Sequence, residues 1–138
     1  MDWAALIAWI VTAAGGFVLL AVWLRGGGMQ QQGGGRIRPP LILSHFALAA
    51  AGLVLWIVFV VNGSETLAWI AFVLLLVVAL LGFGMFAVWL GQRRGGAAAA
   101  AAGDAAERHF PVPVVALHGI LGATTLVLVL LAAAGVGT

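Results

Sequence analysis

The chain has no cysteine, no lysine and no tyrosine, and charged residues make up only 7% of its 138 residues. Without cysteine it can form no disulfide, no thiolate metal ligand and no cysteine nucleophile. A soluble domain carries roughly 25% charged residues, whereas 64% of this chain is hydrophobic. The composition therefore indicates an integral membrane protein. The sequence pI of about 11.3 comes from six arginines, and we expect no nucleic-acid partner.

Four apolar stretches are long enough to cross a bilayer, since a transmembrane helix needs about 20 mostly apolar residues. We expect spans over residues 3–24, 40–62, 66–90 and 112–136. Little is left for a soluble domain, so the predicted fold class is all-α. The chain is expected to form one polytopic four-helix transmembrane bundle over 1–138. The Gly- and Gln-rich connection 25–39 is expected to be flexible, and the alanine run within 91–111 to be helical or disordered.

The distribution of charge predicts the orientation in the membrane. All six arginines fall in the two connections on one side, and the other side has Asp2 and Glu65 but no basic residue. The positive-inside rule therefore places the arginine side in the cytoplasm and both termini outside. The Ala-, Gly- and Arg-rich composition is typical of a bacterial inner-membrane protein. Four tryptophans near span ends are expected to lie at the membrane interface: Trp3, Trp23, Trp69 and Trp89.

The first and third spans align without gaps, which indicates an internal duplication. Residues 3–24 over 69–90 give ten identities in 22 positions, among them Trp3 with Trp69 and a shared "AVWL" block. The second and fourth spans align as well, with seven identities in 19 positions when 40–58 is placed over 113–131. Each predicted repeat, 3–58 and 69–131, contains two helices. The repeats are therefore parallel, related by a pseudo-two-fold axis along the membrane normal.

One histidine lies inside each second helix of the predicted repeats. His45 and His118 are symmetry mates, five residues after Pro40 and Pro113. Because both spans start on the same side, both imidazoles lie at a similar depth and can face each other across the axis. An ionisable residue inside a membrane indicates a functional site by default. Four small residues follow the histidines on the same helix faces and leave room beside the rings: Ala49, Gly52, Gly122 and Thr125.

These features together predict a haem b held by two histidines. The iron would take His45 and His118 as axial ligands, and the flat macrocycle would fill the space beside the small residues. Arg36, Arg38 and Arg108 precede the two histidine spans and would provide counter-charges for the propionates. The predicted function is a small b-type cytochrome near the cytoplasmic face, exchanging electrons with quinone or a partner protein.

The arrangement of four spans with paired membrane histidines resembles the cytochrome b561 class and the haem-b anchor subunits of succinate dehydrogenase and related complexes. The resemblance covers the four spans and rests on the architecture and the two histidines. It implies a bis-histidine haem b and electron-transfer or quinone chemistry. Cytochrome b561 proteins carry two haems held by four histidines, whereas the outer leaflet here has no histidine. Electron transfer across the whole membrane is therefore not expected of this chain alone.

Other functions fit the sequence less well. A bare zinc site usually needs four ligands, and no embedded carboxylate is available either for zinc or for a proton-coupled transporter. Hydrolytic chemistry lacks an acid or an activated nucleophile near either histidine. The alternative that we retain is a non-enzymatic helical subunit that assembles or stabilises a larger membrane complex. In that case the histidines would join helices by hydrogen bonds.

Overall fold

The structure, a computed structural model, describes residues 1–30, 35–96 and 103–137. Four long helices account for most of them: α1 Asp2–Arg25, α2 Pro39–Asn62, α3 Glu65–Arg93 and α5 Val112–Ala133. Two short 3₁₀ turns lie in the connections, η1 Gly28–Gln30 and η2 Ala106–His109. No strand occurs within these described ranges. The alanine run at 97–102 and residues 31–34 of the Gly/Gln-rich connection lie outside the described residues.

The helix ends follow from proline and glycine. Pro39 and Pro40 open α2, where a missing N–H costs nothing, and Gly63 ends it with a left-handed φ of 71°. Two helix ends differ from the prediction by three residues, and the others agree within one residue. The fourth span ends at Ala133 rather than 136, because the chain turns at Gly135 with a φ of 74°. The third span continues three residues further, to Arg93.

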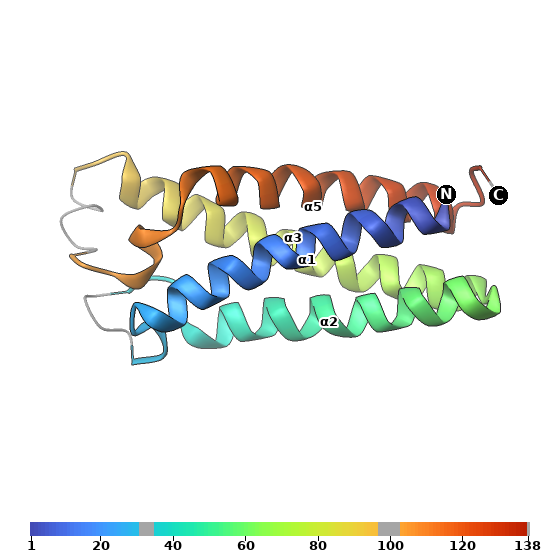
Figure 1. Cartoon of the computed structure of the whole chain (residues 1–138), viewed down its shortest axis with the longest axis horizontal. Helices are drawn as coiled ribbons and strands as arrows, with labels where there is room; N and C mark the ends of the chain where they lie inside the picture. Colours follow the sequence, from blue (N-terminus) through green and yellow to red (C-terminus); the bar gives the residue numbers. More distant parts are fainter. Residues whose placement is uncertain (31–34, 97–102, 138) are drawn as a thin grey trace.

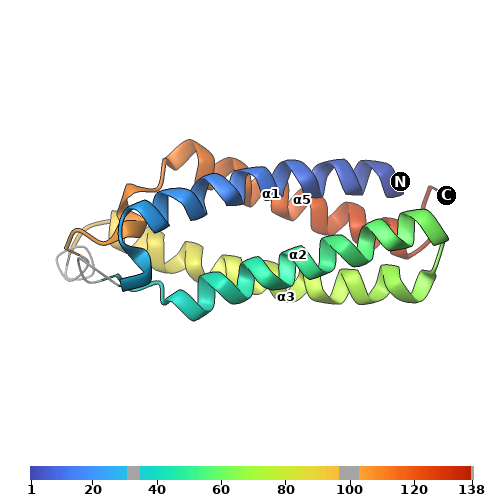
Figure 2. The same ribbon diagram turned by 60° about the horizontal axis from the view of Figure 1, so that its bottom comes forward.

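The four helices run alternately up and down along one long axis (Figure 1). Both termini and the turn between α2 and α3 lie at one end, which we call the terminal end. The two long connections lie at the other end, which we call the arginine end (Figures 1 and 2). Helix α1 packs against α5 and α2, and α3 packs against α2 and α5. The parallel helices therefore stand on the diagonals, α1 opposite α3 and α2 opposite α5.

The outer surface of the bundle is apolar on all sides. Val61 is 81% exposed, Trp3 68% and Ile120 65%. Each of the four helices is long and apolar enough to span a membrane. Such side chains cannot face water over so much of a small protein, and an all-apolar helix surface belongs in lipid. The chain is a multi-pass membrane protein whose helices contact the bilayer.

The densest core fills the half of the bundle nearest the terminal end. It contains a tryptophan pair, Trp9 and Trp56, with ring centroids 6.4 Å apart. Phe59 packs on Trp56 at 4.8 Å, and the small side chains of Ala5, Ala68 and Ala71 let the helices approach these rings. The rest of the core cluster is aliphatic: Leu6, Leu75, Val78, Val129 and Ala132.

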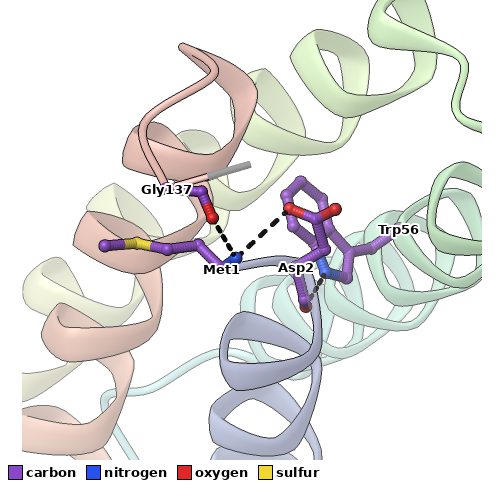
Figure 3. Close-up of polar contacts among 4 residues, drawn as sticks. All are labelled: Met1, Asp2, Trp56 and Gly137. Carbon is purple, nitrogen blue, oxygen red and sulfur yellow. Dashed lines mark hydrogen bonds and ion pairs between the residues drawn. The ribbon is translucent and has the colours of Figure 1, made fainter.

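Polar contacts at the terminal end tie the two chain ends together (Figure 3). The ammonium group of Met1 donates a hydrogen bond to the Gly137 carbonyl oxygen at 3.1 Å and lies 3.9 Å from Asp2 Oδ1. The indole N–H of Trp56 donates to the Asp2 carbonyl oxygen at 3.3 Å. The start of α1 is thereby fixed against both the C-terminal segment and α2.

Two of the four tryptophans expected at the membrane interface are covered by protein. Trp3 and Trp69 are exposed near the terminal end, as an interfacial position requires, but Trp23 is only 1% exposed and Trp89 only 4%. Both lie near the end of their helices, as predicted, but their rings are buried. Trp23 packs against Gly28 of η1. The two are also symmetry mates in the predicted duplication, so both repeats bury an aromatic ring at the arginine end.

Candidate functional site

The structure brings the two membrane histidines together. His45 on α2 and His118 on α5 have ring centroids 6.2 Å apart, with their ring planes at 63°. They come from diagonally opposite helices, so the pair spans the interior of the bundle. Both side chains are half-buried. Facing rings are the arrangement that the aligned positions predicted.

Each imidazole is fixed by a hydrogen bond to the backbone of a neighbouring helix. His118 Nδ1 lies 2.9 Å from the Thr12 carbonyl oxygen on α1, and His45 Nδ1 lies 3.0 Å from the Val78 carbonyl oxygen on α3. A carbonyl oxygen only accepts, so Nδ1 is the protonated nitrogen in both rings. In the neutral rings, Nε2 is therefore left with a free lone pair.

Two glycines leave the Thr12 and Val78 carbonyl oxygens accessible to the histidine rings. In an α-helix the side chain at position i+4 lies beside the carbonyl of residue i, and the residues four positions after Thr12 and Val78 are Gly16 and Gly82. A Cβ at residue 16 would lie 3.1 Å from Cε1 of His118, and one at residue 82 would lie 3.2 Å from Cε1 of His45. The ring reaches the carbonyl because no side chain covers it.

The two contact sets occupy positions that the sequence alignment pairs. Thr12 aligns with Val78 and Gly16 with Gly82, both at an offset of 66 residues, while His45 aligns with His118 at an offset of 73. Each histidine bonds to a helix of the other predicted repeat. This correspondence supports the duplication, because an accidental likeness of apolar spans would not reproduce a polar contact.

The small residues that follow the histidines toward the terminal end are covered by protein. Gly52 is buried, and a Cβ there would lie 3.0 Å from Cζ2 of Trp9. The gap expected beside Gly52 is therefore filled by an indole ring. Ala49 packs against the core cluster, and a Cβ on Gly122 would touch Thr12 Cγ2 at 3.8 Å. Thr125 is buried and its hydroxyl lies 3.0 Å from that of Thr12.

Around the histidines, long stretches of all four helices contain no buried residue. No residue is buried over 10–22 of α1, 39–51 of α2, 79–88 of α3 or 112–124 of α5. This part of the bundle contains both histidines and lies between the core cluster and the buried residues of the arginine end. The room left by Gly15, Gly16 and Gly82 is taken by the histidine side chains themselves, which an added Cβ at each of these positions would contact.

The arginines predicted to neutralise propionates lie on the connections. Arg36, Arg38 and Arg108 are all exposed, and Arg108 Nη1 donates to the Gly103 carbonyl oxygen at 2.6 Å. In the described part of the chain, no hydrogen bond or ion pair joins any of them to His45 or His118. His109 is exposed and its Nε2 lies 3.4 Å from Asp104 Oδ1, away from the histidine pair.

Sequence reasoning missed a buried carboxylate at the arginine end. Glu107 of η2 is fully buried, and its Oε1 accepts from the backbone N–H groups of Arg36 at 2.6 Å and Ile37 at 3.2 Å. It also accepts from Gln92 Nε2 at 3.0 Å. One carboxylate thus joins η2, the segment before α2 and the end of α3. Only its position beside basic residues in a connection distinguished it in sequence, and that pattern usually marks a solvated side chain.

We expect Glu107 to make stability depend on pH. Burial acts to raise the pKa of its carboxyl, but the hydrogen bonds from Gln92, Arg36 and Ile37 outweigh burial and hold the pKa below the ordinary 4.5. The stabilisation is therefore complete above pH 4.5 and is lost as the pH falls through the lowered value. Glu107→Gln should be less stable than wild type by about 1–3 kcal/mol at pH 7. Thermal unfolding in detergent should show this difference shrinking below pH 4.5, and a constant difference would contradict the assignment.

No protein-family model, curated protein or solved structure matches this chain. Within the described residues, no group of three or more His, Cys, Asp or Glu side chains could hold a metal ion. The candidate site therefore consists of two imidazoles with fixed Nδ1 atoms and free Nε2 lone pairs. Two such ligands are too few for a bare zinc ion but are the number that a haem iron takes from the protein.

Proposed function

We propose that the chain is a small membrane b-type cytochrome that binds one haem b through His45 and His118. It would exchange electrons with quinone or with a partner protein. The observation that carries the proposal is the pair of facing, half-buried imidazoles with a ring-centroid separation of 6.2 Å. Each is oriented by a hydrogen bond to a backbone carbonyl.

The residues fit an iron bound between the rings. A metal–imidazole bond is about 2 Å long, so two rings on opposite sides of one ion have centroids roughly 6 Å apart. Metal-ligating histidines usually donate their other N–H to a carbonyl or carboxylate, as Nδ1 does in both rings here. A macrocycle would have to lie between the rings, in the part of the bundle where the four helices contain no buried residue.

The chain's own residues would have simple roles in such a site. The Thr12 and Val78 carbonyls hold the rings in one tautomer and one orientation, and Gly16 and Gly82 give the rings access to those carbonyls. The apolar helices would keep water away and favour electron transfer over side reactions. When bound, the haem would supply a one-electron redox centre. Arg36, Arg38 and Arg108 are proposed to contact its propionates.

One observation favours the alternative function. The histidine bonds join α5 to α1 and α2 to α3, so they also act as interhelical hydrogen bonds in the absence of any cofactor. On this alternative, the chain is a non-enzymatic subunit that assembles with other membrane subunits and stabilises a larger complex.

A haemin titration of the purified protein separates the two functions. The protein expressed with a haem supply should be red, and the apoprotein should take up about one haemin per chain with the absorption spectrum of a low-spin bis-imidazole haem. A colourless protein that also fails to bind added haemin would exclude the cytochrome and leave the scaffold function.

We also propose a location in the bacterial inner membrane, with the arginine end in the cytoplasm and both termini outside. The asymmetry of arginine between the two ends supports this orientation. A periplasm-dependent reporter fused after Thr138 should be active, and one inserted at Gly96 should be inactive. A cytoplasm-dependent reporter at the same two sites should give the opposite pattern. Activity of the periplasmic reporter at Gly96 would reverse the orientation.

A further inference from the structure

The two ends of the bundle carry opposite charge. Six arginines lie at the arginine end against two acidic residues, Asp104 and Glu107, whereas the terminal end has Asp2 and Glu65 and no basic side chain. All six arginines are exposed. Each lies at the end of a span or in the connection next to one: Arg25, Arg36, Arg38, Arg93, Arg94 and Arg108.

These guanidinium groups are not neutralised by the protein. In the described residues, none of the six forms an ion pair with a carboxylate. The buried carboxylate of Glu107 accepts from backbone N–H groups and from Gln92 instead. Arg93 stacks on the Trp89 ring at 5.2 Å, and Arg108 donates to a backbone carbonyl. The described residues therefore leave exposed positive charge at one end of an apolar bundle, next to the ends of its membrane helices.

We propose that the arginine end is a binding surface for anionic phospholipids of the surrounding leaflet. The planar guanidinium group donates paired hydrogen bonds to phosphate oxygens, and basic residues next to membrane spans attract anionic headgroups. A zwitterionic headgroup presents the same phosphate together with a cation that the arginines repel. The surface should therefore select lipids by net negative charge.

Glu107 is a positioning residue for this surface. Its side chain fixes the backbone of Arg36 through Arg36 N–H, and it directly precedes Arg108 in the chain. Gly26, next to Arg25, packs on Ala106 of the same turn. Arg36 and Arg108 thus belong to segments that the buried carboxylate holds together, and Arg25 lies beside the same turn. The headgroup contacts of Arg36 and Arg108 should therefore depend on the Glu107 carboxylate, although that carboxylate is buried away from lipid.

The test measures lipid binding to the purified full-length protein. Native mass spectrometry and thermal unfolding would be recorded with phosphatidylglycerol, with phosphatidylcholine and with inorganic phosphate. We expect phosphatidylglycerol to bind preferentially and to raise the unfolding temperature. Each arginine removed in Arg36→Gln and Arg108→Gln should weaken binding about fivefold, and high salt should reduce the preference. Inorganic phosphate alone should not reproduce the stabilisation, because it lacks acyl chains that contact the apolar helices.

Two variants distinguish binding by arginines held at one end from attraction by the net charge of the whole protein. The double variant Asn62→Asp, Ser64→Asp lowers the net charge by the same amount as the two arginine changes, but at the terminal end. It should leave the lipid preference unchanged. Glu107→Ala makes the chain more positive, so simple charge would strengthen binding, whereas loss of positioning would weaken it. If Glu107→Ala fails to fold, Arg108→Lys takes its place and should weaken binding at unchanged charge. Equal binding of both lipids by wild type, or an equal loss in the terminal-end variant, would overturn the proposal.

Discussion

His45→Ala and His118→Ala should each abolish the low-spin bis-imidazole spectrum of the haem-loaded protein. The iron loses one axial ligand in either variant, and the remaining imidazole can supply only one of the two ligands. The two losses should be similar in size, since the rings have equivalent backbone partners, the carbonyls of Val78 and Thr12. Absorption spectra of the oxidised and reduced proteins, expressed with a haem supply, measure the effect.

His109→Ala is the matched control for these two substitutions. Its imidazole is 57% exposed and lies beside Asp104 in the connection before α5, so the spectrum should stay nearly unchanged. On the scaffold alternative, the wild type shows no haem spectrum. Each membrane histidine would then contribute only an interhelical hydrogen bond, worth about 0.6 kcal/mol on average. Loss of the spectrum in His109→Ala, with retention in His45→Ala, would contradict the assigned ligands.

Among glycine-to-alanine substitutions in the described residues, Gly28→Ala should be the most destabilising. Gly28 is buried under the ring of Trp23, which is itself 1% exposed, and a Cβ there would overlap the indole atoms Cε2, Nε1 and Cδ2. A rigid buried ring cannot move aside without disturbing the closed arginine end. Overpacking of this kind costs about 3 kcal/mol, which corresponds to a fall of about 10 °C in the unfolding temperature.

Gly91→Ala is the control for this overpacking. Gly91 lies in α3 with no atom within 4 Å of an added Cβ, and alanine is favoured over glycine inside a helix by up to about 1 kcal/mol. The variant should be as stable as wild type or slightly more so. Thermal unfolding of both variants in the same detergent tests the pair. A Gly28→Ala protein with the wild-type unfolding temperature would show that the 3₁₀ turn does not pack on Trp23.

The contacts of the paired histidines could be predicted only in part. The predicted duplication made His45 and His118 equivalent positions, which led us to expect both rings at a similar depth on different helices. The sequence could not identify the hydrogen-bond partners of the two rings, because every residue type has a backbone carbonyl. Gly16 and Gly82 were visible as a matched pair, but their role depends on which helix each imidazole approaches.

The space expected beside the small residues that follow the histidines is not present in the structure. Gly52 and Thr125 share a helix face with the rings, and that face was expected to leave a gap. In the structure Trp9 of α1 covers Gly52, and Thr12 of the same helix bonds to Thr125. Periodicity identifies the residues that share a face, but which side chain covers that face depends on the neighbouring helix.

The sequence by itself determined the four membrane helices, their alternating directions and the concentration of positive charge at one end. Long apolar runs, prolines, glycines and arginines decide these features locally, because no backbone in lipid can leave its polar groups unpaired. Only the tertiary structure decided that Trp23 and Trp89 are buried and that Glu107 holds three segments at the arginine end. These features depend on how the connections fold back over the bundle, where segments far apart in sequence meet and no repeating pattern marks the contact.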